Sequence, residues 1–294
     1  MLDGSISRIL SVEPLWGAGP HPPRSLASFD FAQDVLSLVE GRGINGLAMP
    51  LADAIATPDG KRRYVRRLFA TIADRYDLIT VLLSYGQDQR WKKRLVALAA
   101  PAPGARAVDL ATGTGDIAFR LADAGARVSG IDVTHRMIAL ASQKTALRNG
   151  RQQPAPGFLV GDMIGLPFAA ESFDIATAGY GLRNVPDLGA ALDEIHRVLR
   201  RGGTALSLDF NRPSNVLVRA AYLAYLNVVG GLLGWILHRD ADTYRYIPAS
   251  IRNYPGAEGV ARMFEDRGFV DVRCHACLGG LMTIHVARKP EQRA

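Results

Sequence analysis

The segment VDLATGTGDIAF, residues 108–119, decides the fold. It begins as a short apolar strand pattern broken only by Asp109, continues through a loop that contains Gly113 and Gly115, and runs into a helix pattern. A buried strand, a glycine loop and a helix form the opening unit of nucleotide-binding α/β folds, in which a ligand approaches the loop backbone closely. The segment therefore predicts the first strand of an α/β sheet and a ligand at its carboxyl end.

Strand and helix patterns alternate along the rest of the chain. Apolar runs of strand length follow at 127–133, 157–162, 173–179 and 204–210, with helical periodicity between most of them. A last helix is expected at 259–269, and two final strands over 270–289 joined through Gly279 and Gly280. This order predicts an α/β fold with a doubly wound sheet covered by helices on both faces.

The chain before residue 61 has a different composition. Because GPHPPR and GRGING interrupt it, we expect residues 1–60 to be a poorly ordered leader and residues 61–294 to form one domain. That domain starts with a helical cap over 61–100 and contains inserted helices at about 213–258. Its first predicted helix, over 61–80, has a basic outer face and an apolar face made by Val65, Leu68, Phe69, Ile72 and Tyr76.

Composition limits the compartment and the metal chemistry. Two cysteines in 294 residues suit a reducing compartment, and we expect the chain in the cytoplasm. The net charge of +7 suits a nucleic acid, an anionic membrane surface or an acidic substrate and by itself distinguishes none of them. Cys274 and Cys277 form one CxxC motif without a second pair of ligands, which is weak evidence for zinc. We expect both to be buried structural thiols and predict no metal site. No stacking platform for nucleic acid follows the fourth strand.

Two ligands fit the glycine loop. Gly113-x-Gly115-x-x-Ala118 satisfies the dinucleotide fingerprint, and Asp132 lies near the spacing expected for a ribose contact. However, the carboxylate of Asp109 beside the loop would repel a pyrophosphate, whereas S-adenosylmethionine has an ammonium and a sulfonium group. Asp162, at the end of the third strand, is placed to accept from the adenine amine. These residues favour S-adenosylmethionine, although Asp109 or Asp162 alone would also serve as a helix cap or turn residue.

Further motifs resemble a known family. Over residues 61–289, DLATGTGD, GDMIGLPF, GYGLRNVPD, EIHRVLRRGG and DADTYRYIPASIRNYP resemble the UbiE-type C-methyltransferases of ubiquinone and menaquinone biosynthesis. The resemblance implies a seven-stranded class I methyltransferase sheet whose last two strands form a reversed hairpin. It also implies S-adenosylmethionine as the methyl donor and a ring carbon of a reduced polyprenyl quinone as the acceptor.

The resemblance also implies site residues. Thr114, Asp132, Asp162, Met163 and Gly179 match the donor-binding positions of the family, where a serine is common in place of Gly179. Two further positions, Tyr76 and Tyr246, are expected to bind the acceptor.

The stretch GYGLRNVPD carries the expected chemistry. Methylation of a ring carbon requires an activated ring held in line with the donor, so positioning supplies much of the rate. Arg183 is expected to stabilise a developing phenolate or to hold a water that removes the proton, and Asn184 to fix the hydroxyl. Tyr180 and Tyr76 would stack against the acceptor ring. The alternative is that Arg183 pairs with Asp187 or Asp209 and pins the loop.

The apolar run VLVRAAYLAYLNVVGGLLGWIL, residues 216–237, approaches the length of a membrane span. Because it contains Arg219 and a Gly-Gly break and falls between strands of one sheet, we expect helices that cover the acceptor pocket. Their apolar faces would contact the inner face of the membrane peripherally, and a homodimer is also considered. Two other functions stay open, a methyltransferase of another aromatic or lipid molecule and a non-catalytic S-adenosylmethionine-binding subunit.

Overall fold

The computed structural model describes residues 51–84, 86–148, 154–238 and 243–291. Most of the predicted leader lies outside these ranges, and its predicted disorder stays a prediction. Its last ten residues are described and form helix α2 (Leu51–Ala54) and the start of α3 (Pro58–Ile72). Helical structure begins before residue 61 because Thr57 caps α3 by accepting from the Gly60 amide, and Pro58 suits the first helical turn.

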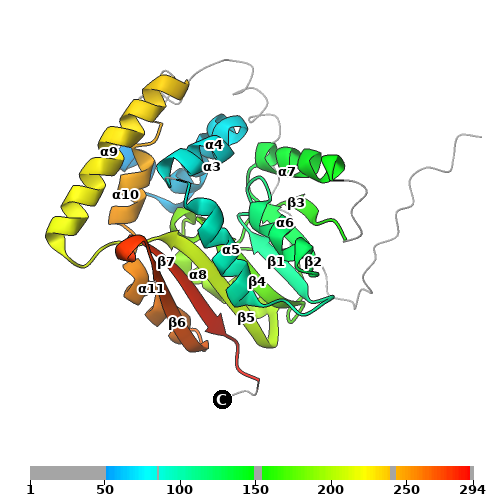
Figure 1. Cartoon of the computed structure of the whole chain (residues 1–294). Helices are drawn as coiled ribbons and strands as arrows, with labels where there is room; N and C mark the ends of the chain where they lie inside the picture. The colour runs from blue at the N-terminus through cyan, green and yellow to red at the C-terminus, as the bar shows by residue number, and fades with distance from the viewer. Residues whose placement is uncertain (1–50, 85, 149–153, 239–242, 292–294) are drawn as a thin grey trace, which may run out of the picture. The chain divides into compact units, whose positions relative to one another are not determined.

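The sheet has seven strands, in the order β3-β2-β1-β4-β5-β7-β6, which confirms the predicted α/β architecture (Figure 1). All neighbours are parallel except β7, which runs antiparallel to β5 and β6, so the last two strands form the expected reversed hairpin. The strands are β1 (Arg106–Leu110), β2 (Arg127–Asp132), β3 (Gly157–Val160), β4 (Phe173–Gly179), β5 (Leu199–Phe210), β6 (Val270–Cys277) and β7 (Met282–Arg288). The 3₁₀ turn η4 (Leu278–Gly280) joins the hairpin.

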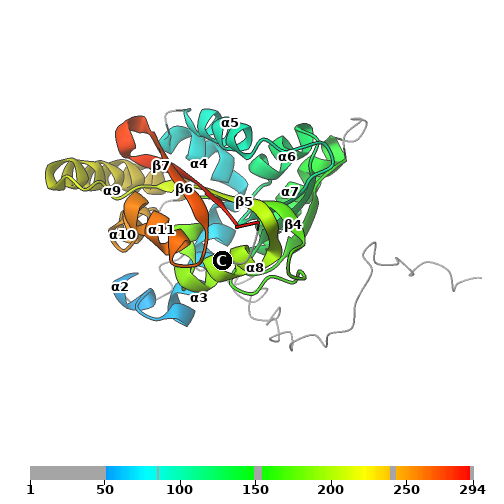
Figure 2. The same cartoon turned by 90° about the horizontal axis from the view of Figure 1, so that it is seen from below.

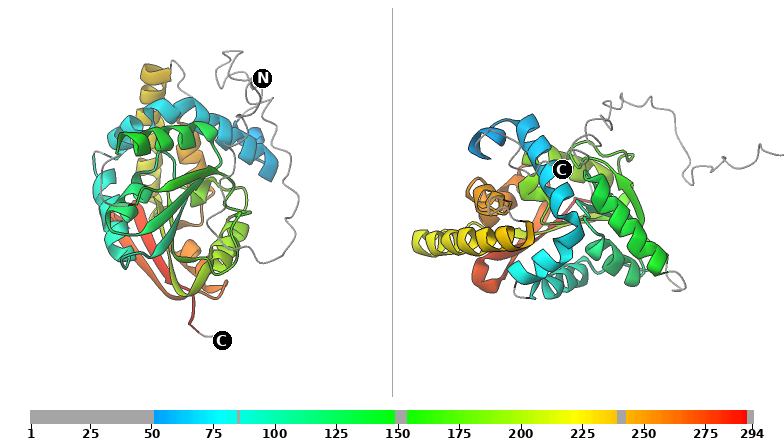
Figure 3. Two further views of the ribbon diagram at one scale, coloured as in Figure 1. Left: turned by 90° about the vertical axis from the view of Figure 1, so that its right-hand side faces the viewer. Right: turned by 90° about the horizontal axis from the view of Figure 1, so that it is seen from above.

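Helices cover both faces of the sheet (Figure 3). Helices α5 (Asp88–Ala99) and α6 (Asp116–Asp123) pack against one face. The other face is covered by α8 (Leu188–Val198) and α11 (Gly256–Glu265). Helix α7 (His135–Leu147) packs against β2 and β3. Because side chains alternate along a strand, β1 contributes Val108 and Leu110 to one core and Ala107 to the other.

Two element boundaries differ from the prediction. The helix expected over 61–80 breaks at the 3₁₀ turn η2 (Ala73–Arg75), after which α4 (Tyr76–Leu83) begins. Strand β5 begins at Leu199, five residues earlier than expected, because Leu199 pairs with Phe173 before an irregularity in the register. Residues 200–203 therefore belong to the strand.

The predicted insertion is helical. It contains α9 (Val216–His238), which packs against α10 (Tyr246–Arg252), and both lie to one side of the sheet (Figure 2). Tyr244 and Tyr246 join α3 and α4 in a separate apolar cluster, whereas Tyr222 and Leu226 of α9 pack on Ile251. The insertion and the N-terminal helices thus form a cover with cores of its own.

The prediction for the CxxC motif is wrong at one position. Cys277 is buried, but Cys274 is exposed. The two thiols are three residues apart on β6, so they point to opposite faces of the strand.

Candidate active site

The loop after β1 makes a sharp turn toward α6. Gly113 and Gly115 have φ of 54° and 90°, a region that side chains seldom adopt. A Cβ at Gly115, the N-cap of α6, would lie 2.8 Å from the rings of Phe119 and Phe158. At Gly113 the nearest atom to a Cβ would be the Tyr76 ring at 3.7 Å, which leaves the backbone open to a ligand. The two glycines therefore serve different purposes, packing and access.

Asp132 ends β2 and is tied to that loop. Its Oδ2 accepts from the Gly113 amide at 3.0 Å, and its Oδ1 accepts from the Thr134 amide at 2.8 Å. Burial raises the pKa of Asp132, and these backbone bonds counteract the shift. A carboxylate oxygen accepts more than one hydrogen bond, which suits acceptance from ribose hydroxyls, the role that the sequence predicts.

A cavity, here called the donor cleft, opens at the carboxyl ends of β1 to β4. It lies where the strand order reverses between β1 and β4, the position at which open α/β sheets bind ligands. Five of the predicted donor-binding residues line it, namely Gly113, Asp132, Asp162, Met163 and Gly179. Helix α3 closes the cleft from the other side with Arg62, Val65 and Phe69.

Three predicted donor residues do not line the cleft. Gly115 is in the cap of α6. Asp109 is 1% exposed, and its two oxygens accept from the hydroxyls of Thr112 and Thr177, each at 2.6 Å. The Thr114 hydroxyl donates to Asp77 of α4 at 2.6 Å. Asp109 thus fixes the loop through Thr112, and Thr114 fixes it through Asp77. Direct contact of Asp109 or Thr114 with a donor stays a prediction.

Asp162 has partners at both oxygens. Oδ1 accepts from the Ile164 amide at 3.2 Å, and Oδ2 lies 3.1 Å from Arg62 Nε. Arg62 was expected on the outer basic face of its helix. Arg62 instead lines the donor cleft. Its ion pair with Asp162 joins α3 of the helical cover to the loop after β3.

A second cavity of about 530 Å³, here called the acceptor cavity, adjoins the donor cleft. Its wall is mostly apolar and comes from α3, α4, α9, α10 and the end of β5. Phe69, Tyr76 and Tyr180 line both cavities and so form a shared wall. Two other predicted residues, Arg183 and Tyr246, line the acceptor cavity.

Arg183 lies in the 3₁₀ turn η3 (Leu182–Asn184), directly after β4. Its side chain is 6% exposed, and Nε lies 3.0 Å from Asp209 Oδ1 in an ion pair. Nη1 donates to Ser250 Oγ at 2.7 Å and to Asn184 Oδ1 at 3.3 Å, and the guanidinium carbon lies 4.8 Å from the Phe210 ring centre. Within the described residues, no hydrogen bond uses Nη2, so one edge of the guanidinium stays available to a ligand.

The partner of Arg183 answers an alternative that the sequence left open. Arg183 pairs with Asp209 at the end of β5, whereas Asp187 caps α8 by accepting from the Ala190 amide. The pairing does not remove Arg183 from the cavity wall, because the same side chain lines the acceptor cavity. Arg183 can therefore pin the loop through Asp209 and also face the acceptor cavity.

Asn184, Tyr180 and Tyr246 differ in their surroundings. Asn184 lines the donor cleft and donates from Nδ2 to the Tyr180 carbonyl at 2.8 Å, which fixes the loop. Tyr180 has φ of 59°, a strained value for an aromatic residue that often marks a functional site. Tyr246 is 1% exposed, and its hydroxyl has no hydrogen-bond partner in the described structure. An orphaned buried hydroxyl in a cavity wall suits a ligand contact.

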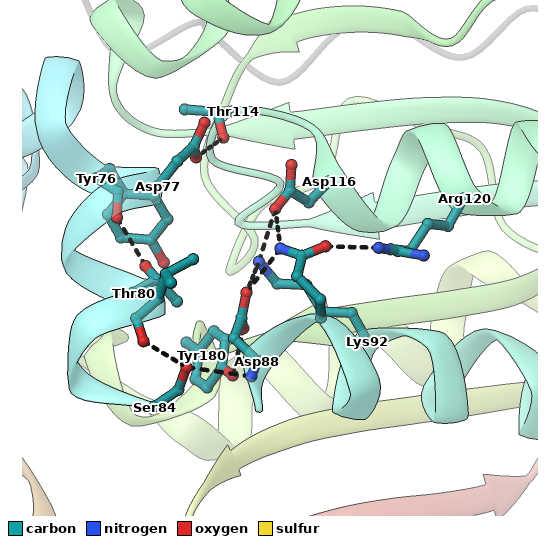
Figure 4. A network of polar contacts seen from close by, with 12 residues as sticks. Tyr76, Asp77, Thr80, Ser84, Asp88, Lys92, Thr114, Asp116, Arg120 and Tyr180 are labelled. Atoms are coloured by element: carbon teal, nitrogen blue, oxygen red, sulfur yellow. Dashed lines mark hydrogen bonds and ion pairs between the residues drawn. The ribbon is translucent and has the colours of Figure 1, made fainter. Parts of the chain in front are cut away.

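Sequence reasoning missed a buried polar cluster behind Tyr180 (Figure 4). Lys92 Nζ lies 2.8 Å from Asp88 and 2.9 Å from Asp116, and the Tyr180 hydroxyl donates to Asp88 at 2.7 Å. Although burial opposes ionisation, the pKa of Asp116 is lowered to about 2 by Lys92. The available signal was that Asp88 and Lys92, four residues apart, share the helix face of Trp91 and Leu95.

The donor cleft fits S-adenosylmethionine on its own features. The cleft provides an accessible backbone at Gly113 and two carboxylates at successive strand ends, Asp132 and Asp162. When bound, this donor supplies a methyl group on a positively charged sulfur, and the carboxylates suit a cation better than a phosphate. Asp132 and Asp162 would hold its polar groups, while Phe69 and Met163 provide apolar surface.

Comparison with known proteins agrees with this geometry. The model of the ubiE/COQ5 methyltransferase family matches residues 57–289. A demethylmenaquinone methyltransferase of Staphylococcus aureus (strain JH9) is 33% identical over 238 residues, which are 80% of this chain and 97% of that protein.

Solved structures share the fold. The magnesium protoporphyrin IX methyltransferase of Synechocystis PCC 6803, solved with bound S-adenosylhomocysteine, has a TM-score of 0.56 and 19% identity, covering 78% of this chain and 99% of that chain. A possible histamine N-methyltransferase of Thermotoga maritima has a TM-score of 0.55 and 19% identity, covering 76% and 99%. The chain therefore belongs to the ubiE/COQ5 methyltransferase family and is an S-adenosylmethionine-dependent methyltransferase.

Proposed function

We propose that the enzyme transfers a methyl group from S-adenosylmethionine to a ring carbon of a reduced polyprenyl quinone in menaquinone or ubiquinone biosynthesis. The name of the Staphylococcus aureus relative supports a demethylmenaquinol as one such acceptor. The observation that carries the proposal is the acceptor cavity. It is large, mostly apolar, and shares a wall with the donor cleft.

The polar groups of this cavity suit a quinol ring with an apolar tail. Arg183 offers the unused Nη2, and Tyr246 offers an orphaned hydroxyl. Burial raises the pKa of Tyr246, so that it stays a donor at neutral pH. A ring oxygen is expected to bind at these two groups, and the tail along Leu68, Ile72 and Leu226.

Arg183 would act as an electrostatic group. A guanidinium stays protonated and is a poor base, but it stabilises negative charge that develops on a ring oxygen. Asp209 and Ser250 hold it in place, and the Phe210 ring lies against its face. A more electron-rich ring carbon then accepts the methyl group more readily.

Turnover of labelled S-adenosylmethionine with a reduced short-chain prenyl-naphthoquinol or prenyl-benzoquinol, under anaerobic conditions, tests the proposal. We expect label in the quinol ring, and we expect Arg183→Ala to lower kcat by roughly 10²–10³ with little change in donor affinity. Arg183→Lys keeps the charge but loses the fork of donors, so only partial activity is expected.

Two outcomes would contradict the proposal. Label transfer to another aromatic or lipid molecule, with none to either quinol, would replace the acceptor class. Loss of donor binding in Arg183→Ala, with normal turnover at saturating donor, would remove Arg183 from the acceptor side. Binding of S-adenosylhomocysteine by each variant, measured by calorimetry, shows that the fold is intact.

We also propose that this cytoplasmic enzyme contacts the inner face of the membrane through α9. By length and apolar composition alone, α9 would pass as a membrane span; five of its 23 residues are buried, so only a small part of the helix packs inside the protein. Its outer stripe includes Leu217, Val228, Leu232 and Trp235, all exposed. A lipid surface is the favoured partner because the acceptor is a lipid and the chain carries a net charge of +7, which attracts anionic headgroups.

The cavity opening supports the same proposal. Val218 and Leu278 line the acceptor cavity and are 48% and 45% exposed, so apolar surface surrounds an entrance for the tail. Sedimentation with anionic phosphatidylglycerol vesicles should weaken in the double variant Leu232→Ser/Trp235→Ser. Leu147→Ser, which changes an exposed leucine of α7, is the matched control. Equal sedimentation of all three proteins would contradict membrane contact. The homodimer stays a prediction.

A further inference from the structure

A base is required to remove the proton from the hydroxyl of the methyl acceptor, and the acceptor cavity does not supply one directly. Among the described residues that line it, there is no carboxylate and no imidazole. Two buried carboxylates, Asp209 and Asp88, lie directly behind the wall. Asp209 is reached through Arg183, whose guanidinium does not release a proton, and it also accepts from the Arg183 and Phe210 amides.

Asp88 is reached through a group that does carry a movable proton. The Tyr180 hydroxyl donates to Asp88 Oδ1 at 2.7 Å. The other oxygen, Oδ2, accepts from Gln89 at 3.0 Å and lies 2.8 Å from Lys92 Nζ. Oδ1 is thus left to Tyr180. Asp88 is 0% exposed, so within the described residues its contact with the cavity runs through the side chains of the wall.

The direction of the Tyr180 hydrogen bond decides what the tyrosine presents to a ligand. Burial raises the pKa of Tyr180 well above its usual value, and Asp88 adds to the shift, so the hydroxyl keeps its proton. Because that proton points to Asp88, the free lone pair of the tyrosine oxygen is an acceptor. It is suited to a ligand that donates, such as the hydroxyl of a quinol.

The position of Asp88 places this hydroxyl on the acceptor side of the shared wall. Ser84 and Trp91 line the acceptor cavity but not the donor cleft. Ser84 Oγ accepts from the Asp88 amide at 3.1 Å, and Trp91 follows Asp88 by one helical turn. Figure 4 shows Ser84, Asp88 and Tyr180 together beside Lys92.

On the basis of the proposed function, we propose that Tyr180 and Asp88 form a proton relay that ionises the acceptor hydroxyl. The acceptor O–H bond breaks and its proton passes to the Tyr180 oxygen, while the Tyr180 proton passes to Asp88 Oδ1. The net change is one proton moved from the acceptor to Asp88, and no oxidant or reductant takes part. Arg183 stabilises the phenolate that results. Asp88 acts as a positioning residue through Tyr180.

The charges around Asp88 suit this role. Lys92 of α5 and Asp116 of α6 complete the cluster, and Tyr76 of α4 and Tyr180 after β4 are the other titratable groups that face it. Although burial alone would lower it, the pKa of Lys92 is raised by Asp116 and Asp88, so Lys92 stays charged. Lys92 thus places a permanent positive charge beside Asp88 Oδ2 and leaves Oδ1 to the Tyr180 hydroxyl.

The pH profile of single-turnover methylation tests the relay, with the full-length enzyme, labelled donor and a reduced short-chain prenyl-naphthoquinol. Asp88→Asn and Tyr180→Phe are each expected to lower the rate at pH 7 by roughly 10²–10⁴. The deficit should shrink toward pH 10, because a phenolic hydroxyl with a pKa of about 10 then ionises without help. Asp88→Glu should recover part of the rate at pH 7.

The matched control is Asp174→Asn, at the opposite end of the strand that leads to Tyr180. Asp174 accepts from the Arg106 amide at 2.7 Å and pairs with Arg200, far from both cavities. This variant should keep the wild-type pH profile. A deficit of Asp88→Asn that is the same at every pH, or no deficit, would overturn the relay.

Other outcomes separate the relay from the proposed function. If the wild-type enzyme methylates the quinol and Asp88→Asn keeps the wild-type rate and profile, the relay is wrong and the function stands. If the wild-type enzyme methylates no quinol at any pH, the proposed function is wrong, and the relay, which depends on it, is wrong as well. Binding of S-adenosylhomocysteine by Asp88→Asn with wild-type affinity shows that the variant folds, and Tyr180→Phe supplies an independent test if it does not.

Discussion

At the scale of single residues, the site depends on polar groups that are buried behind the surfaces facing a ligand. Asp209 lies behind Arg183, Asp88 behind Tyr180, and Asp109 behind the glycine loop. Burying a carboxylate is costly unless it is paired or hydrogen-bonded, and each of these three has such partners. These three carboxylates hold Arg183, Tyr180 and the glycine loop in fixed positions.

Asp109 is expected to make stability depend on pH. Burial raises its pKa from 3.8 to about 6, although the hydroxyls of Thr112 and Thr177 counteract the shift. The folded state therefore holds this proton more tightly than the unfolded state. The contribution of Asp109 to the free energy of unfolding is greatest below pH 4 and is lost as pH rises through 6, a change of about 3 kcal/mol.

Asp109→Asn removes this titration. The free energy of unfolding, measured in denaturant at several pH values between 4 and 7, should shift in favour of the variant as pH rises. The wild-type enzyme measured under the same conditions is the reference, since other groups titrate equally in both. A difference between the two proteins that does not change with pH would show that Asp109 is not held in the way described.

Gly179 is expected to be coupled to Ile117. A Cβ at Gly179 would lie 2.4 Å from Ile117 Cδ1 and 3.8 Å from Cγ1, so only the terminal methyl group stands in the way. Gly179→Ala should destabilise by about 1–3 kcal/mol through overpacking, and Ile117→Val by about 0.5–1.5 kcal/mol. The double variant should lose less than the sum, as a double-mutant cycle of unfolding free energies will show. Simple additivity would contradict the coupling.

At the scale of elements, α3 acts as a clamp on the turn that carries Arg183. Lys61 in the first part of α3 donates from Nζ to the carbonyls of Arg183 at 3.1 Å and Val185 at 2.6 Å. One turn of η3 cannot satisfy its own carbonyls, so a donor from another element is needed. Helix α3 therefore positions the turn that carries Arg183 as well as closing the donor cleft.

Lys61→Met tests this clamp by removing the charge and keeping the apolar stem. We expect a loss of about 1–3 kcal/mol in the free energy of unfolding, together with a lower kcat, because η3 loses two hydrogen bonds. Arg67→Met, on the exposed face of α3, is the matched control and should change stability by less than about 0.5 kcal/mol. Equal effects of the two substitutions would show that the contacts of Lys61 do not hold the turn.

At the scale of the described domain, the sheet and the helical cover form different cavities. The sheet provides most of the donor cleft through its strand ends, whereas α3, α4, α9 and α10 provide most of the acceptor cavity. The two halves meet at Phe69, Tyr76 and Tyr180. Changes in the cover should therefore affect the acceptor more than the donor.

Gly230 in α9 allows a test of this division. A Cβ there would lie 3.2 Å from Tyr244 Cβ, so Gly230→Val should push α9 away from the cover. We expect a raised KM for the quinol and an unchanged Kd for S-adenosylhomocysteine, measured by steady-state kinetics and calorimetry. Ala224→Val, at an exposed position of the same helix, is the control. A parallel loss of donor affinity would contradict the division.

The sequence by itself determined the seven-stranded α/β sheet, the glycine loop and the acidic residues at the strand ends, because these follow from local periodicity and from the rule that ligands bind at carboxyl ends of parallel strands. It also singled out Arg183 and Tyr180, which line the acceptor cavity, although their roles stay predictions. Only the tertiary structure decided which partner each polar group has. Asp209 rather than Asp187 pairs with Arg183, and Asp88, 92 residues before Tyr180, receives its hydroxyl. The physical reason is that an ion pair or hydrogen bond depends on distances through space, which helix and strand patterns do not encode.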